Sequence, residues 1–201
     1  MINAIIFDLG GVLIDWNPRY LYRQLFKTEE EVDWFLENIT TLDWNEQHDA
    51  GYLIERGTNE LVEKHPEWES QIRAYYERWT EMFGEPIHET INILEKLKKS
   101  AKYRLFALTN WSAELFPWAR KNYPFLKSFE GIIVSGEEKM RKPQPEIFQL
   151  LIDRYNLDKS GSLFIDDNFR NVKAAEAFGI RSIYFTSSEE LENNLKRLNI
   201  L

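Results

Sequence analysis

The sequence predicts an α/β fold, in which a Rossmann-like core of mostly parallel strands carries helices on both faces. Five short apolar runs, rich in β-branched or aromatic residues, have the length and composition of buried strands. They cover residues 2–7, 103–108, 131–134, 163–165 and 182–185. Between the later runs, apolar residues recur at helical spacing. Such alternation is typical of a parallel sheet, whose ligand crevice lies outside the carboxyl ends of the strands.

Three core helices are expected from this spacing. Their apolar residues are Ile91, Leu94 and Leu97, then Ile147, Leu150 and Leu151, then Val172, Ala175 and Phe178. Gly179 follows the last of these helices as a plausible C-cap, because glycine adopts the left-handed conformation without steric cost. Pro145 suits a first helical turn, where its missing N–H would have no partner in any case.

Residues 16–85 interrupt the alternation. No strand is expected there, and aromatic residues recur at helical spacing, as in Trp34, Trp44, Tyr75 and Trp79. We therefore predict two units: an α/β core of residues 1–15 and 86–201, and an inserted all-helical cap of residues 16–85. Most of the seven tryptophans are expected to anchor apolar cores.

Composition excludes several classes of function. The net charge is −8, with 33 acidic against 25 basic side chains, so the field of the protein repels nucleic acid. Cysteine is absent, which removes disulfides, thiolate metal sites and cysteine nucleophiles. Neither a membrane-spanning run nor a basic leader is found, so we predict no membrane partner and a cytoplasmic location.

The first motif is an aspartate at the end of a predicted strand. Asp8 is followed by Gly10 and Gly11, which allow the backbone to approach a ligand closely. A carboxylate in this place can attack phosphorus and form an aspartyl-phosphate. Taken alone, the motif fits better an aspartate that stabilises a turn.

Two more motifs supply groups that bind a phosphoryl group. Thr109 and Asn110 follow the second predicted strand and offer a hydroxyl and an amide as hydrogen-bond donors. Lys142 precedes Pro143, which restricts its backbone, and its ammonium can neutralise phosphate as a point charge. Separately, these residues also fit a helix N-cap and a solvated surface charge.

The last motif is a pair of carboxylates, Asp166 and Asp167, at the end of the fourth predicted strand. Adjacent acids repel each other, and a cation between them and Asp8 relieves that repulsion. Hard oxygen ligands are those that Mg²⁺ prefers. Together the four motifs provide a nucleophile, a lysine, phosphate-binding donors and a Mg²⁺ site in one crevice.

In this order, the four motifs resemble motifs one to four of the haloacid dehalogenase superfamily, and the resemblance covers the whole chain. It is nearest to bacterial sugar-phosphate phosphatases, including the α-glucose-1-phosphate phosphatase group. The resemblance implies that Asp8 is nucleophile and metal ligand, and that the Gly10 carbonyl and Asp167 also bind Mg²⁺, with Asp166 in support. It further implies that Thr109, Asn110 and Lys142 hold the phosphoryl group, and that the cap closes over the leaving group.

The chain departs from the superfamily pattern at Gly10. Most phosphatases of the superfamily carry an aspartate there, two positions after the nucleophile, as the general acid for the leaving group. The nearest sugar-phosphatase relatives share the Asp-x-Gly pattern, and Asp15 is a candidate replacement acid. A dehalogenase, which uses neither the second aspartate nor a metal, stays an alternative, although the pair Asp166 and Asp167 favours magnesium.

Two further alternatives are a catalytically silent phospho-ligand-binding protein and a phospho-receiver domain. The receiver is disfavoured, because receivers place the acidic pair on the first strand and have no large helical insert. We predict a Mg²⁺-dependent phosphatase that hydrolyses small phosphate monoesters, first of all sugar phosphates, through an aspartyl-phosphate on Asp8. Candidates for substrate contact in the cap are Trp16, Trp44, Glu46 and His48, with ordinary cap packing as the alternative for each.

Overall fold

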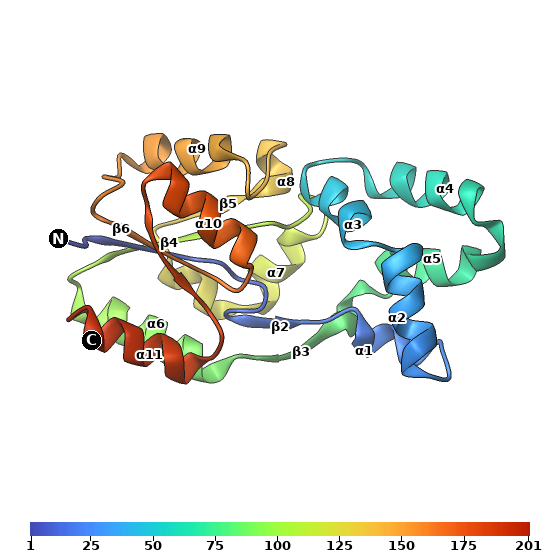
Figure 1. The fold of residues 1–201 in the computed structure, drawn as a ribbon, viewed down its shortest axis with the longest axis horizontal. Helices are drawn as coiled ribbons and strands as arrows, with labels where there is room; N and C mark the ends of the chain where they lie inside the picture. Colours follow the sequence, from blue (N-terminus) through green and yellow to red (C-terminus); the bar gives the residue numbers. More distant parts are fainter.

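A five-stranded parallel sheet forms the core of the protein (Figure 1). The computed structural model describes residues 1–201. The strands are β1 (Ala4–Phe7), β4 (Arg104–Thr109), β5 (Gly131–Val134), β6 (Ser162–Asp166) and β7 (Arg181–Tyr184). Their order across the sheet is β5-β4-β1-β6-β7, and every neighbouring pair is parallel. The α/β fold is confirmed, and each predicted strand lies within two residues of an observed one.

Helices cover both faces of this sheet (Figure 1). Ile5 and Phe7 of β1 pack in the same apolar cluster as residues of α6 (His88–Ser100), α7 (Phe116–Asn122) and α11 (Ser188–Arg197). On the opposite face, Ala4 and Ile6 pack with α9 (Pro145–Tyr155) and α10 (Phe169–Phe178). The short α8 (Ser135–Glu138) follows β5 directly. Burial on both faces explains why the strands are continuous apolar runs.

The predicted signals at two helix ends hold in the structure. Pro145 opens α9, and Gly179 ends α10 with a φ of +100°, a conformation that glycine adopts without steric cost.

None of the helices combines the length and the apolar composition that crossing a membrane requires.

A separate helical unit lies beside the sheet domain (Figure 1). It contains α1 (Arg19–Tyr22), α2 (Glu29–Asn38), α3 (Leu42–Asp49), α4 (Ile54–Lys64) and α5 (Glu69–Glu77), with 3₁₀ turns at Pro66–Trp68 and Trp79–Met82. Aromatic and aliphatic side chains, among them Tyr22, Phe35 and Tyr75, form an apolar cluster of its own. This separate cluster supports our proposed division into a core and a cap of residues 16–85.

A two-stranded antiparallel ribbon joins the two units. Strand β2 (Ile14–Trp16) pairs with β3 (Phe83–Pro86), so the prediction that residues 16–85 contain no strand is wrong at both ends of that range. The two strands are short, and β3 contains Gly84 and Pro86, residue types that are depleted in strands. The ribbon therefore forms because β2 and β3 pair with each other, and not because their residues favour strand conformation.

Burial of His48 couples the stability of the cap to pH. His48 is 1% exposed, and its ring packs edge-on against Trp44 and Tyr76 at centroid distances of 4.8 and 5.0 Å. Burial lowers the pKa of His48 to about 4. An unfolded histidine titrates near 6.5, so between these values the unfolded chain binds more protons than the folded one. Folded stability due to this group therefore falls as the pH drops below about 6.5.

We predict that acidification from pH 7 to pH 5 lowers the unfolding free energy of both proteins, and lowers that of the wild type by about 1–2 kcal/mol more than that of His48→Phe. Phenylalanine retains the aromatic packing and does not titrate. Urea denaturation of both proteins at the two pH values measures the difference. An identical loss in both would show that His48 is not the responsible group.

Candidate active site

The polar residues of the first, second and fourth motifs meet at one edge of the sheet. Phe7, the last residue of β1, pairs with Ala107 of β4 on one side and Ile165 of β6 on the other. One or two residues further along, these three neighbouring strands deliver Asp8, Thr109 and Asp166. Parallel strands thus bring residues more than 50 positions apart in the sequence to the same crevice.

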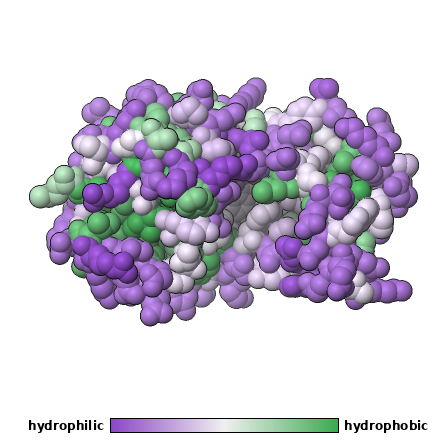
Figure 2. All heavy atoms as spheres, in the orientation of Figure 1, coloured by the Kyte–Doolittle hydropathy of each residue, from purple (hydrophilic) through white to green (hydrophobic).

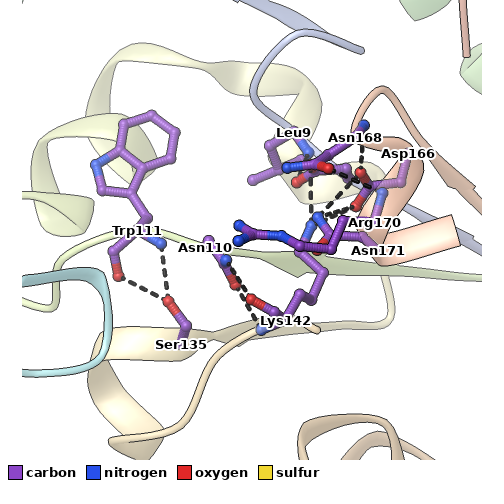
Figure 3. Close-up of polar contacts among 10 residues, drawn as sticks. Leu9, Asn110, Trp111, Ser135, Lys142, Asp166, Asn168, Arg170 and Asn171 are labelled. Atoms are coloured by element: carbon purple, nitrogen blue, oxygen red, sulfur yellow. Dashed lines mark hydrogen bonds and ion pairs between the residues drawn. The ribbon is translucent and has the colours of Figure 1, made fainter. Parts of the chain in front are cut away.

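Lys142 is the central cation of this edge. Its side chain is fully buried, with Nζ 2.9 Å from Asp8 Oδ2 and 2.7 Å from Asp166 Oδ2. Figure 3 shows the lysine side chain directed at Asp166, and Asn110 beside the backbone of Lys142. Asn110 Nδ2 donates to the Lys142 carbonyl at 3.0 Å, and the Lys142 amide donates to Asn110 Oδ1 at 2.9 Å. Asn110 therefore fixes the loop that carries the lysine.

Asp166 is held by the start of α10 as well as by the lysine. The Asn168 amide donates to Asp166 Oδ1 at 2.8 Å, and Asn171 Nδ2 lies 3.1 Å from both carboxylate oxygens (Figure 3). Both oxygens of Asp166 thus have protein partners, which fits the supporting role expected for it.

The turn after β1 depends on its two glycines in different ways. Gly11 has a φ of +71°, and a Cβ there would lie 2.0 Å from Asp167 Oδ2. Gly10 has no neighbouring atom within 4 Å of the position that a Cβ would take. No backbone amide donates to the Gly10 carbonyl, whereas the Leu9 carbonyl accepts from three amides. The Gly10 carbonyl is therefore available to a ligand.

The site has too little positive charge for its carboxylates. Oxygens of Asp8, Asp166 and Asp167 lie within 4.8 Å of one another. Burial, opposed by Lys142 and reinforced by the two other carboxylates, raises the pKa of Asp8 well above its usual range. Burial and Asp166 raise the pKa of Asp167 to about 6. Burial opposes the charge of Lys142, yet Asp166 and Asp8 outweigh it and raise the lysine pKa. Three hard oxygen donors with excess negative charge suit a divalent cation such as Mg²⁺.

A pocket of about 90 Å³ opens between the crevice and the cap. Figure 2 shows the surface hollowed between the two units. Most of the lining is aromatic or aliphatic, and its polar exceptions are Asn45, Asp49, Asn110 and Ser112. Gly10 also lines the pocket, so a group bound there would lie beside the turn that carries Asp8.

The cap residues that the sequence suggested for substrate contact divide into three groups. Trp16 lines the pocket. Trp44 and His48 lie inside the cap, 8% and 1% exposed, so packing explains both. Glu46 is buried and pairs with Arg141 and Arg170 of the core. These ion pairs join the cap to the core directly above the crevice.

Asp15, the candidate replacement acid, does not line the pocket. Its Oδ2 accepts a hydrogen bond from the Tyr20 hydroxyl at 2.7 Å. The side chain packs so closely on Gly84 that a Cβ on that glycine would lie 2.1 Å from Oδ2. Asp15 therefore contributes to the ribbon that joins the cap and the core.

Comparison with known sequences identifies the family. The haloacid dehalogenase-like hydrolase family matches residues 2–179. The chain belongs to this family. In the chain, the helical unit lies between β2 and β3, after the first motif.

Relatives of known activity cover nearly the whole hydrolase. A sesquiterpene phosphatase of Aspergillus oryzae is 28% identical, and the alignment covers 92% of this chain and 91% of the relative. A phosphorylated carbohydrates phosphatase of Thermotoga maritima is 25% identical, with 90% and 84% covered. A HAD family enzyme of Bacteroides thetaiotaomicron, solved with magnesium and inorganic phosphate, is 26% identical with a TM-score of 0.68, and 93% and 96% of the two chains are covered.

The pocket also contains polar residues that the motifs did not indicate. Asn45 and Asp49 lie one turn apart on α3, and Ser112 follows the second motif. Polar residues at this spacing occur on many solvated helix faces, so local sequence carries no signal that separates them. Only the docking of α3 against the core shows that they face the crevice.

We predict that Lys142→Met abolishes turnover and lowers the unfolding free energy by about 3 kcal/mol, because it leaves buried carboxylates without their cation. Phosphate-release assays and urea denaturation measure the two effects. Lys121→Met, which removes an exposed lysine near the end of α7, is the matched control. Wild-type stability in Lys142→Met would contradict the central place given to this lysine.

Proposed function

We propose that the protein is a Mg²⁺-dependent phosphatase that releases inorganic phosphate from small phosphate monoesters. The observation that carries the proposal is the fully buried Lys142, bound to both Asp8 and Asp166, with Asp167 close enough to complete a cation site. Catalysis of phosphoryl transfer depends mainly on such positioned charge. The phosphatases among the relatives support the same reaction.

In the proposed reaction, Asp8 is the nucleophile. One oxygen of its carboxylate attacks phosphorus and forms an aspartyl-phosphate, which water then hydrolyses. Lys142 holds Asp8 in place and neutralises charge on the phosphoryl group, which Thr109 and Asn110 also contact. Asp8, the Gly10 carbonyl and Asp167 would hold Mg²⁺, with Asp166 in support. The ion supplies charge neutralisation and stabilises the ionised form of Asp8.

Two classes of alcohol fit the proposal. Sugar phosphates are our first candidate, and the phosphorylated carbohydrates phosphatase among the relatives supports it. The aromatic and aliphatic lining of the pocket favours a second candidate, the phosphate ester of an apolar alcohol. The sesquiterpene phosphatase of A. oryzae supports that class. A substrate panel must therefore include both.

The two alternative functions, a dehalogenase and a silent binding protein, fit the site less well. A dehalogenase that works without metal has no use for two adjacent carboxylates beside a third. A silent binding protein has no need to bury a lysine between two carboxylates, an arrangement with a large desolvation cost. Each of these hypotheses predicts a different result in an assay of phosphate release.

We predict phosphate release from at least one member of a panel of sugar phosphates, prenyl phosphates and p-nitrophenyl phosphate in the presence of Mg²⁺. A chelator should abolish it, and Asp8→Asn should reduce it by about 1,000-fold or more, because the amide is no nucleophile. Asp43→Asn, which changes an exposed aspartate on α3, is the matched control.

Two results would refute the proposal. Halide release from a 2-haloacid without phosphate release would establish a dehalogenase instead. Binding of phosphate esters without turnover of any of them would establish a silent binding protein.

A further inference from the structure

The proposed reaction lacks a proton donor for the leaving group. An alkoxide is a poor leaving group unless it receives a proton as its bond to phosphorus breaks. Gly10 has no side chain, and Asp15 is occupied by Tyr20 outside the pocket. Lys142 is bound to the nucleophile Asp8 and to Asp166, and it does not line the pocket. The donor must therefore come from another residue that lines the pocket.

Asp49, the last residue of α3, is the only carboxylic acid in the pocket lining. It lines the same pocket as Gly10 and Asn110, from the cap side. The leaving group of a phosphate bound at Asp8 would extend away from the sheet edge into this pocket. Asp49 therefore lines the space into which the leaving group would extend.

Asp49 is held in place by contacts from both units. The Ser135 hydroxyl of the core donates to the Asp49 carbonyl at 2.5 Å. Asn45 Nδ2 donates to Asp49 Oδ2 at 3.1 Å, while Asn45 Oδ1 accepts from the Tyr76 hydroxyl. Because Tyr76 fixes which end of the Asn45 amide faces Asp49, Oδ2 receives a donor. The hydrogen bond from Asn45 therefore fixes the orientation of the Asp49 carboxyl group.

The surroundings of Asp49 favour its neutral form. Burial and the neighbouring Glu46 raise the pKa of Asp49 to about 7, against the opposing charges of Arg141 and Lys142. An acid with a pKa near the working pH keeps a proton to donate and still loses it readily. This property supports the assignment, which rests on the position of Asp49 in the pocket.

We propose that Asp49 is the general acid of the reaction and replaces, from the cap, the aspartate that Gly10 lacks. The proposal rests on the phosphatase function proposed above. As Asp8 forms its bond to phosphorus, the bond to the leaving oxygen breaks and its electron pair stays on that oxygen. The oxygen takes the proton of Asp49, so an alcohol departs and Asp49 becomes a carboxylate.

The same residue completes the cycle. The Asp49 carboxylate accepts a proton from the water that attacks phosphorus in the aspartyl-phosphate. The bond between phosphorus and Asp8 breaks, which regenerates the Asp8 carboxylate and releases inorganic phosphate. Asp49 is then protonated again, and no other reactant is consumed.

The test compares leaving groups. Asp49→Asn should reduce kcat/KM for an alkyl phosphate by about 100-fold or more, because kcat/KM reports the step in which the alkoxide leaves and needs the proton. For p-nitrophenyl phosphate, whose leaving group departs as a stable anion, the reduction in kcat/KM should be less than about tenfold, while slower hydrolysis of the shared aspartyl-phosphate lowers kcat with both substrates. Asparagine preserves the hydrogen bond to Asn45, and Asp43→Asn serves as the control on the same helix.

A second variant tests whether the function lost in Asp49→Asn is proton donation. No atom lies within 4 Å of the position that a Cβ on residue 10 would take, so Gly10→Asp can be introduced into Asp49→Asn. It should restore most of the lost activity toward the alkyl phosphate. Equal losses of kcat/KM with both substrates, or no loss with either, would overturn the role of Asp49 as general acid and leave the phosphatase function intact. A wild type inactive on both substrates would overturn the phosphatase function as well.

Discussion

The burial of one ammonium group among three carboxylates is the constraint on which the rest of this structure depends. Lys142 is 0% exposed and is bound to Asp8 and Asp166. Removal of its ammonium group would leave these buried carboxylates without a counter-charge. The sheet places both aspartates at adjacent strand ends, and Asn110 clamps the lysine backbone beside them. A site in which three carboxylates surround one ammonium group is organised to receive a cation and an anionic phosphoryl group together.

The cap completes this site from outside. Glu46 pairs with Arg141 and Arg170, while Ser135 binds the carbonyl of Asp49, so the end of α3 is attached to the core at the rim of the crevice. The ribbon of β2 and β3 forms the covalent connection on the other side of the pocket. The pocket is lined mostly by apolar side chains, and a substrate that fills it displaces water, which strengthens the electrostatic interactions inside it. In our proposal, a cap residue that lines this pocket, Asp49, also supplies the proton.

The core and its motifs could be predicted from the sequence because their signals are local. A strand buried on both faces is a continuous apolar run, and Asp8 or Asp166 at its end is visible as a polar residue after that run. The ribbon and Asp49 could not be predicted in this way. Strand β3 exists only through its pairing with β2, and Asp49 differs from a solvated acid only because α3 docks on the core. Both depend on contacts between residues far apart in the chain.

The most direct test of the account is to find the covalent intermediate on Asp8. The protein would be mixed with p-nitrophenyl phosphate and Mg²⁺, quenched in acid during turnover and treated with borohydride, which reduces an acyl phosphate to an alcohol. Mass spectrometry of the peptide that contains residue 8 then reads the result. We predict homoserine at this position, absent without substrate. Turnover with an unmodified Asp8 under these conditions would show that water attacks phosphorus directly, and would contradict the role given to Asp8.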